Sequence, residues 1–158
     1  MDTKQTKPII LKVPAFEDFR GYLAVPYDKS VDFKICQINQ GYSKKAFTLR
    51  GLHFQEGEHA QAKLVSCLHG SIFNVAVDLR PGETFGHAYS AVLSFENRKQ
   101  MYISQKGRVL IHRLSASCIR KPRISVRITL CTTISTGWTL RSTPITKTRI
   151  WKQVLKKS

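Results

Sequence analysis

Acidic residues are missing from the last third of this chain. Of the 158 residues, the segment from Gln105 to Ser158 holds thirteen Lys and Arg and no Asp or Glu, whereas residues 1–104 hold thirteen basic and ten acidic residues. The formal net charge of +16 is therefore concentrated at one end, with about +3 on the remainder. A positive charge favours nucleic acid or an anionic membrane as partner only when it covers the folded surface. The composition instead divides the chain in two.

The chain also lacks paired cysteines, long apolar runs and a charged-then-apolar N-terminal segment. Its four cysteines, Cys36, Cys67, Cys118 and Cys131, are too far apart for a CxxC pair. No apolar run approaches the roughly 20 residues of a membrane-spanning helix, and nothing resembles a signal peptide. We therefore expect a cytoplasmic protein with free thiols and no membrane partner, whose length suits a single domain.

A period of two dominates residues 49–95, which is typical of half-buried strands. In the run 71–79, Phe73, Val75, Val77 and Leu79 share one face while Asn74 and Asp78 share the other, and the run 89–95 repeats the alternation. Turn-forming stretches lie between the runs, and no helical stripe is present. This pattern predicts an all-β sandwich or jelly roll, whose interior can hold a ligand.

Two short motifs carry the strongest chemical signal. RGLHFQ at 50–55 and QAKLV at 61–65 place His53 and Lys63 on adjacent predicted strands joined by a short turn. A base and a cation on such strands can face one pocket. Taken alone, the same pattern also fits a packed strand histidine and a solvated lysine.

Together with VAVDLR at 75–80, these motifs resemble the dTDP-4-dehydrorhamnose 3,5-epimerase family, whose fold is a cupin-like jelly roll. The matching positions are Phe16, Asp18, Arg20 and Gly21; Gln37 and Asn39; 50–55; 61–65; Gly70; 75–80; Phe85 and Gly86; and Leu93, Ser94 and Asn97. The resemblance covers about the first two thirds of the chain. It implies a cytoplasmic enzyme of carbohydrate biosynthesis, of the kind that serves lipopolysaccharide, and a homodimer formed by strand exchange near the N-terminus.

The resemblance also implies a reaction and a set of site residues. The substrate is dTDP-4-dehydro-6-deoxy-D-glucose, inverted at C3 and C5 beside the C4 ketone to give dTDP-4-dehydro-L-rhamnose. His53 matches the base and Lys63 the cation near the C4 oxygen, where an enolate develops. The positions that match substrate contacts are Phe16, Arg20, Gln37, Asn39 and Arg50. Their chemistry requires no cofactor.

An alternative role for His53 is metal binding, because many jelly-roll enzymes bind a metal through histidines. Such a site usually needs two histidines one residue apart on a strand, with a carboxylate and a third histidine. Here Gln55 stands where the second ligand belongs, and the other histidines are scattered. We expect no metal.

The chain departs from the family after Ser104. The family continues with a Gly-Phe-Ala-His-Gly-Phe stretch, an acid tyrosine and an aspartate that orients the base, and none of these is recognisable here. We expect residues 1–104 to form the N-terminal two thirds of a jelly roll that is incomplete at its C-terminus. Because the last strands are missing, sheet edges and apolar surface are left uncovered and we expect low solubility. Because the acid and the orienting carboxylate are missing, we expect little or no activity.

Residues 105–158 form a basic tail with two interpretations. One is a genuine, poorly ordered tail. The other is a shifted reading frame, because reading the codons of Arg120–Arg127 one base later allows Glu-Asn-x-Glu-Phe-Gln-Tyr among the degenerate possibilities.

Two alternative functions follow from these departures. One is a catalytically inactive jelly roll that still binds a nucleotide-sugar through Arg20, Arg50 and Lys63. The other is nucleic-acid binding through the basic tail, which Trp138 and Trp151 support only weakly because base stacking uses interleaved aromatic residues.

Overall fold

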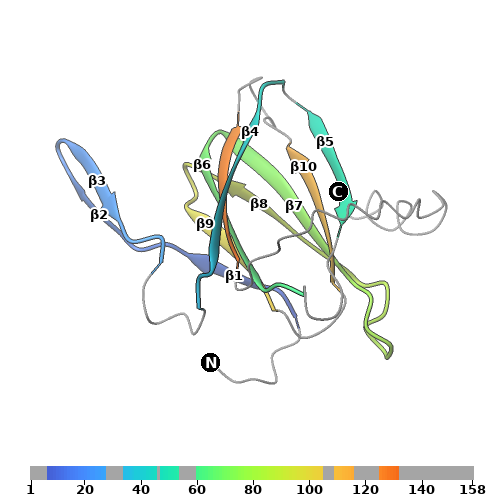
Figure 1. Cartoon of the computed structure of the whole chain (residues 1–158). Coiled ribbons are helices and arrows are strands. Elements are labelled where there is room, and N and C mark those ends of the chain that lie inside the picture. Colours follow the sequence, from blue (N-terminus) through green and yellow to red (C-terminus); the bar gives the residue numbers. More distant parts are fainter. Residues whose placement is uncertain are drawn as a thin grey trace.

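A computed structural model describes residues 7–27, 34–45, 47–53, 60–104, 109–115 and 125–131, with His53 and the last two segments described through the backbone alone. Throughout these residues the regular structure is strand, and no helix occurs. The all-β prediction is therefore confirmed. Figure 1 shows two facing sheets and a separate hairpin.

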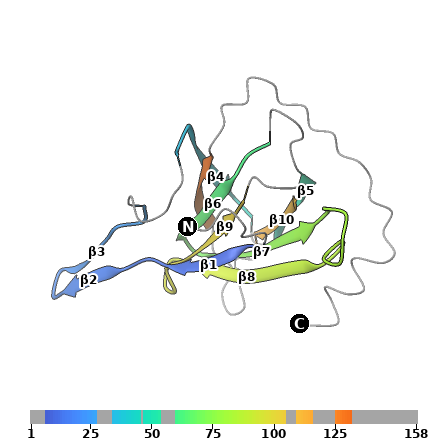
Figure 2. The same ribbon diagram turned by 90° about the horizontal axis from the view of Figure 1, so that it is seen from below.

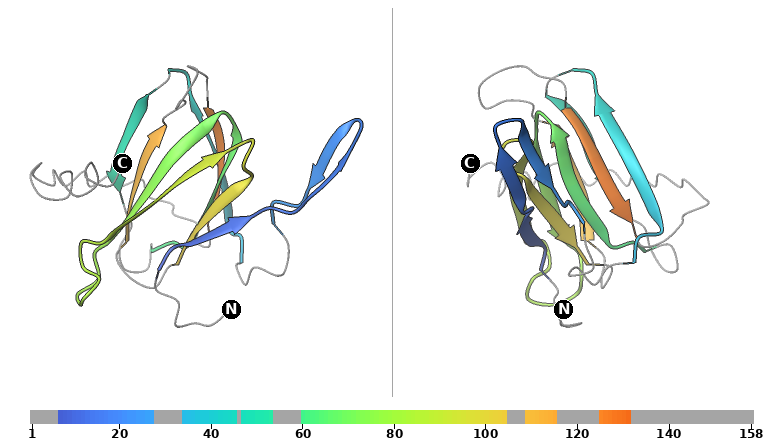
Figure 3. Two further views of the ribbon diagram at one scale, coloured as in Figure 1. Left: turned by 180° about the vertical axis from the view of Figure 1, so that it is seen from behind. Right: turned by 90° about the vertical axis from the view of Figure 1, so that its left-hand side faces the viewer.

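The larger sheet has five antiparallel strands in the order β1-β9-β6-β11-β4. Their bounds are β1 Ile9–Lys12, β9 Lys99–Ile103, β6 Lys63–His69, β11 Ser125–Cys131 and β4 Gln37–Ser43. Figure 3 shows β6, β11 and β4 side by side. The smaller sheet has four strands in the order β5-β10-β7-β8. Their bounds are β5 Thr48–His53, β10 Val109–Ser115, β7 Ser71–Asp78 and β8 Ala88–Ser94.

The basic tail supplies an interior strand to each sheet. β11 lies between β6 and β4, and β10 lies between β5 and β7. β11 pairs along its whole length, from Ser125 opposite Ser43 to Cys131 opposite Gln37. The tail is thus continuous with the sandwich at these two segments, although the sequence motifs of the family are recognisable only as far as residue 104.

The core lies between the two sheets. Its main cluster combines β6 and β9 of the larger sheet with β7 and β8 of the smaller one: Val65, Cys67, Ile72, Ala76, Leu93, Met101 and Ile103, all at most 6% exposed. These residues recur at every second position because successive side chains of a strand point to opposite faces. Burying each large apolar side chain stabilises the fold by about 1.5–3 kcal/mol.

The strand β7 differs from the half-buried strand that its alternation predicts. Asn74 and Asp78, on the face expected to be polar and exposed, are 0% and 1% exposed. The reason is that β7 is an interior strand covered on both faces. Ile72 and Ala76 pack into the main cluster, while Val75 and Val77 pack against Leu52 and Leu79 on the other face.

The chain passes directly from the larger sheet to the smaller one at Gly70. Gly70 alone separates β6 from β7, and its φ of 72° lies in the left-handed region that glycine adopts without strain. Because the chain reverses there from one sheet into the other, Lys63 at the start of β6 and Asp78 at the end of β7 lie at the same end of the sandwich. We call this the Lys63 end.

The hairpin of β2 (Ala15–Asp18) and β3 (Gly21–Ala24) extends away from the sandwich. Figure 2 shows it as the continuation of β1. Contacts with the turn between β8 and β9 fix its direction: Arg98 forms an ion pair of 3.0 Å with Glu17 and lies 5.1 Å from the centre of the Tyr22 ring. Tyr22 also lies 5.9 Å from Phe95, between ring centres.

Candidate functional site

We call residues that lie opposite one another on neighbouring strands a row. In the larger sheet, Gln37 and Lys63 belong to one row at the Lys63 end. Both pair with Cys131, Gln37 from β4 and Lys63 from β6. Lys63 is only 6% exposed and lies two residues before Val65, so it faces the core between the sheets. Gln37 donates a hydrogen bond of 2.8 Å from Nε2 to Oδ1 of Asn39 on the same strand face. Three predicted site residues therefore lie on the inner face of this sheet.

The register of the smaller sheet brings positions 50 and 53 together. Residues three apart on a regular strand belong to opposite faces. Here a bulge intervenes: His53 pairs with Ile111 and Arg50 with Arg113, so Gly51 and Leu52 both stand opposite His112. Ile111 in turn pairs with Ala76, and Arg113 with Asn74, both on the inner side of β7. Positions 50 and 53 thus fall in two successive inner rows.

Arg50 connects the two sheets. Its Nη2 donates a hydrogen bond of 2.9 Å to the main-chain carbonyl of Tyr42 on β4. This bond runs from the edge of the smaller sheet to the edge of the larger one, so the guanidinium links the two edges.

Two inner residues were not predicted from the sequence. Asn74 on β7 donates from Nδ2 to the sulfur of Met101 at 3.0 Å. Tyr89 on β8 pairs with Ala76, in the row that also contains Ile111 and His53. A lone asparagine in a strand and a tyrosine in an alternating run have no distinctive sequence signal, and only the sheet register reveals their location.

Among the residues that the structure describes, four inner side chains have a buried polar atom without a protein hydrogen-bond partner. The atoms are Gln37 Oε1, Arg50 Nε, Asn74 Oδ1 and the Tyr89 hydroxyl. Leaving a buried donor or acceptor unsatisfied costs about 1–3 kcal/mol. A polar molecule between the sheets would supply the missing partners, so these atoms mark the interior as a candidate binding site.

The structure does not bring Phe16 and Arg20 to this site. Both lie on the projecting hairpin, where Phe16 is 68% exposed. The Arg20 guanidinium pairs with Asp18, at 2.6 Å between Nη2 and Oδ2, and lies 5.6 Å from the centre of the Phe19 ring. That hydrogen-bonded pair holds the pKa of the exposed Asp18 below its ordinary value.

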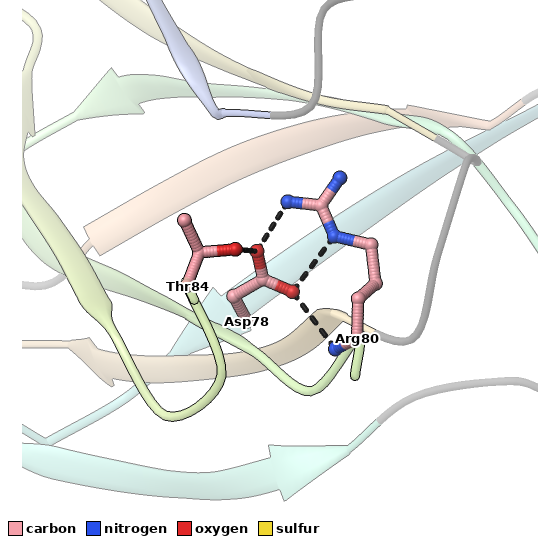
Figure 4. A network of polar contacts seen from close by, with 3 residues as sticks. All are labelled: Asp78, Arg80 and Thr84. Atoms are coloured by element: carbon pink, nitrogen blue, oxygen red, sulfur yellow. Dashed lines mark hydrogen bonds and ion pairs between the residues drawn. The ribbon is translucent and has the colours of Figure 1, made fainter. Parts of the chain in front are cut away.

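A polar network closes the Lys63 end of the smaller sheet (Figure 4). The Asp78 carboxylate accepts hydrogen bonds from Arg80 Nε at 2.8 Å, from Arg80 Nη2 and from Thr84 Oγ1 at 2.8 Å. Burial would raise the pKa of Asp78, but the hydrogen bonds from Arg80 and Thr84 outweigh burial and hold the pKa below its ordinary value. The same pair raises the pKa of Arg80. The network fixes the turn 79–87 between β7 and β8.

Metal ligands do not cluster in the part of the chain that the structure describes, where no three His, Cys, Asp or Glu side chains gather. Those residues also include no helix long and apolar enough to cross a membrane.

Two facing antiparallel sheets with polar groups between them define a cupin-like β-sandwich of the nucleotide-sugar epimerase class. The model of the dTDP-4-dehydrorhamnose 3,5-epimerase family matches residues 2–108, and the chain belongs to this family of isomerases. The epimerase of Escherichia coli K12 is 38% identical over 102 residues, which are 60% of this chain and 55% of that protein.

Solved structures extend the likeness beyond the sequence match. The epimerase from Elizabethkingia anophelis has a TM-score of 0.71 at 34% identity, covering 87% of this chain and 75% of that one. The Legionella pneumophila enzyme in complex with dTDP-4-keto-L-rhamnose has a TM-score of 0.71 at 27% identity, covering 85% and 71%. Because residues 1–104 are only about two thirds of the chain, the structural likeness includes part of the tail. The chain nevertheless spans little more than half the length of the curated relatives it matches.

Proposed function

We propose that this chain binds a dTDP-4-dehydro-6-deoxy sugar between its sheets and exchanges the protons at C3 and C5 on the way to epimerisation. The observation that carries the proposal is the arrangement of the inner rows. Lys63 and Gln37 lie on the larger sheet, positions 50 and 53 on the smaller one, with unpartnered polar atoms between them. The Legionella pneumophila relative with dTDP-4-keto-L-rhamnose supports the choice of ligand.

In this proposal His53 removes a proton from the carbon beside the ketone. A histidine suits the step because its ordinary pKa lies near physiological pH. The negative charge that moves onto the C4 oxygen is stabilised by Lys63, whose burial between the sheets strengthens that attraction relative to water. Arg50 contacts the diphosphate, for which a guanidinium is well suited. No organic cofactor takes part in these steps.

The rate should lie well below that of the relatives. The carboxylate that orients the base in the family has no recognisable counterpart in this chain, and such a group contributes orders of magnitude to catalysis by a histidine. The cytoplasmic location predicted from the sequence remains a prediction.

We further propose a homodimer in which the hairpin carries Phe16 and Arg20 to the second copy. Phe16, Phe19 and Leu23 are 68%, 97% and 70% exposed, which is unusual for three large apolar side chains on one short hairpin. Phe16 and Arg20 lie away from the candidate site of their own subunit. A dimer explains this location if the hairpin completes the site of the second copy.

The test incubates the protein with dTDP-4-dehydro-6-deoxy-D-glucose in deuterated water. Proton exchange is measured by NMR as the loss of the C3 and C5 proton signals of the sugar. We expect exchange with the unmodified chain and a reduction of about 100-fold or more in His53→Asn. The matched control is His69→Asn, an exposed residue at the opposite end of β6, which should exchange normally. Equal exchange by His53→Asn would contradict the assignment of the base. Binding of the sugar without any exchange would favour the inactive binding protein.

A further inference from the structure

The turn between β8 and β9 holds Arg98 in an uncommon backbone conformation. Its φ of 51° lies in the left-handed region, which residues other than glycine rarely adopt. Hydrogen bonds within the turn maintain this conformation. The main-chain N–H of Arg98 donates to the carbonyl of Ser94 at 3.1 Å, and Ser94 and Asn97 exchange two bonds of 3.0 Å. An arginine at a position that the backbone disfavours points to a role for its side chain.

Arg98 contacts the N-terminal segment at three points. Its main-chain carbonyl accepts a hydrogen bond of 3.0 Å from the N–H of Val13, shortly before β2 begins. Its Nη1 forms the ion pair of 3.0 Å with Glu17 on β2, and its guanidinium lies 5.1 Å from the centre of the Tyr22 ring on β3. One residue of the turn therefore contacts both strands of the hairpin and the segment that leads into it.

The side-chain contacts involve only one face of the hairpin. Glu17 lies opposite Tyr22 and Phe16 opposite Leu23, so the two pairs belong to opposite faces. We call the face of Glu17 and Tyr22 the clamp face and the face of Phe16 and Leu23 the open face. Phe95 adds a contact on the clamp face, at 5.9 Å from Tyr22 between ring centres. The open face is the more exposed of the two.

Arg20 is held beside the open face by Asp18. Asp18 lies two residues after Phe16 on β2 and therefore shares its face. The Asp18 carboxylate accepts hydrogen bonds from the main-chain N–H of Arg20 at 2.8 Å and from its Nη2 at 2.6 Å. Phe16 and Arg20, the two hairpin residues that the resemblance assigns to the substrate, thus lie on the side of the hairpin away from Arg98.

We propose that Arg98 is a positioning residue, which holds the hairpin so that its open face brings Phe16 and Arg20 to the binding site of a second subunit. This inference rests on the proposed function and on the proposed homodimer. Arg98 acts through the direction of the hairpin and does not touch the sugar. Its loss should therefore weaken substrate binding and leave proton transfer in a saturated site unchanged.

The first variant is Arg98→Gln, which removes the ion pair and the contact with the Tyr22 ring. We expect the KM for dTDP-4-dehydro-6-deoxy-D-glucose in the proton-exchange assay to rise about tenfold, with kcat within about threefold of the unmodified chain. The nuclear Overhauser effect between the rings of Tyr22 and Phe95 should weaken as the hairpin loses its fixed direction. Arg98→Lys keeps the cation and should return the KM to within about threefold.

Two further variants separate positioning from folding. Arg98→Gly removes the same side-chain contacts but suits the positive φ of the turn. It should unfold at a temperature no lower than that of Arg98→Gln, while its KM rises equally. Lys99→Gln makes the same charge change at the neighbouring exposed residue and should alter neither the KM nor the ring contact.

Mixed dimers test whether Arg98 acts on the site of the other subunit. Equal amounts of Arg98→Gln and His53→Asn are mixed after dissociation, and exchange is measured well below the KM. If Arg98 positions its own hairpin for the second subunit, each heterodimer has one site with an intact base and a correctly held hairpin. The mixture should then reach about a quarter of the rate of the unmodified chain, against about 5% without complementation.

A rate near that lower value would place the effect of Arg98 within its own subunit and overturn the inference. An unchanged KM in Arg98→Gln would also overturn it, and so would a kcat of Arg98→Gly that falls as much as its KM rises. Absence of exchange in the unmodified chain would overturn the proposed function instead. The dimer dissociation constant, measured by sedimentation, then decides the role of Arg98: it should rise about tenfold in Arg98→Gln, and an unchanged value would refute that role.

Discussion

Arg50 Nη2 lies 2.9 Å from the main-chain oxygen of Tyr42, and this hydrogen bond joins the edge strands of the two sheets. Arg50 thereby has two roles, as a link between the sheets and as a candidate contact for the diphosphate.

The first prediction concerns Arg50→Gln. Loss of the charged donor leaves the Tyr42 carbonyl without this partner and should lower the free energy of unfolding by about 1.5 kcal/mol. The affinity for dTDP should fall at least tenfold, because a charge-assisted contact to the diphosphate is lost. Denaturant unfolding and calorimetric titration measure the two effects. Lys99→Gln, an exposed change on β9, should alter neither; equal effects in both variants would contradict a specific role for Arg50.

The second prediction concerns the buried carboxylate of Asp78. Its pKa is lowered in the folded state, so its contribution to stability is complete above the unfolded pKa near 4 and is lost as the pH falls through the lower folded value. Asp78→Asn should reduce the free energy of unfolding at pH 7 by about 3 kcal/mol, because Arg80 loses its charged partner. The stability of the variant should also decline less steeply below pH 4.

Unfolding curves from pH 2 to 8 measure both parts of this prediction. Asp18→Asn is the control, since Asp18 and Arg20 form an exposed pair on the hairpin that water screens. If the free energy of unfolding falls equally steeply below pH 4 in Asp78→Asn and in the unmodified chain, the network of Figure 4 does not stabilise the fold through charge.

The third prediction concerns the tail. Ending the chain after Ser104 removes β10 and β11, so that in the described sheets β4 and β5 lose their strand neighbours. The fragment should be insoluble or lack a cooperative unfolding transition, because it exposes strand edges and apolar surface. Circular dichroism and light scattering detect this. A soluble fragment with a sharp unfolding transition would show that the tail strands are dispensable.

The sequence predicted the strands with the clearest alternation. The runs 71–79 and 89–95 correspond to β7 and β8, because a strand with distinct faces has a period of two. β10 and β11 were not predicted. Their segments mix Arg, Ser, Thr and Ile without sustained alternation, so only pairing with β4, β5, β6 and β7 identifies them as strands.

The candidate site was predicted in part. The structure places Gln37, Asn39 and Lys63, which the resemblance assigns to the site, on the inner face of the larger sheet, and positions 50 and 53 in inner rows of the smaller one. Periodicity alone would separate positions 50 and 53, since the bulge at Gly51 and Leu52 has no distinctive sequence signal. The role of each residue stays a prediction, as does the division of the chain at residue 104.

The fourth prediction uses the proposed dimer. Arg20→Ala and His53→Asn should each be nearly inactive alone. If the hairpin completes the partner's site, equal mixing after dissociation creates heterodimers in which one site has both residues intact. Activity should then recover to about a quarter of that of the unmodified chain. The control mixes His53→Asn with Lys63→Met, which lie in one subunit's site and should not complement. No recovery in the first mixture would contradict the shared site.

The measurement that tests the central claim most directly is two-dimensional NMR of the side-chain amides during titration with dTDP-4-dehydro-6-deoxy-D-glucose. The account predicts that the signals of Gln37, Asn39 and Asn74 shift, because these amides face the interior where the sugar binds. The signals of Asn97, in the turn between β8 and β9, and of Gln100, which contacts Pro26 and Ser66, should stay in place. Shifts confined to Asn97 and Gln100, or no shift at saturating ligand, would contradict a binding site between the sheets.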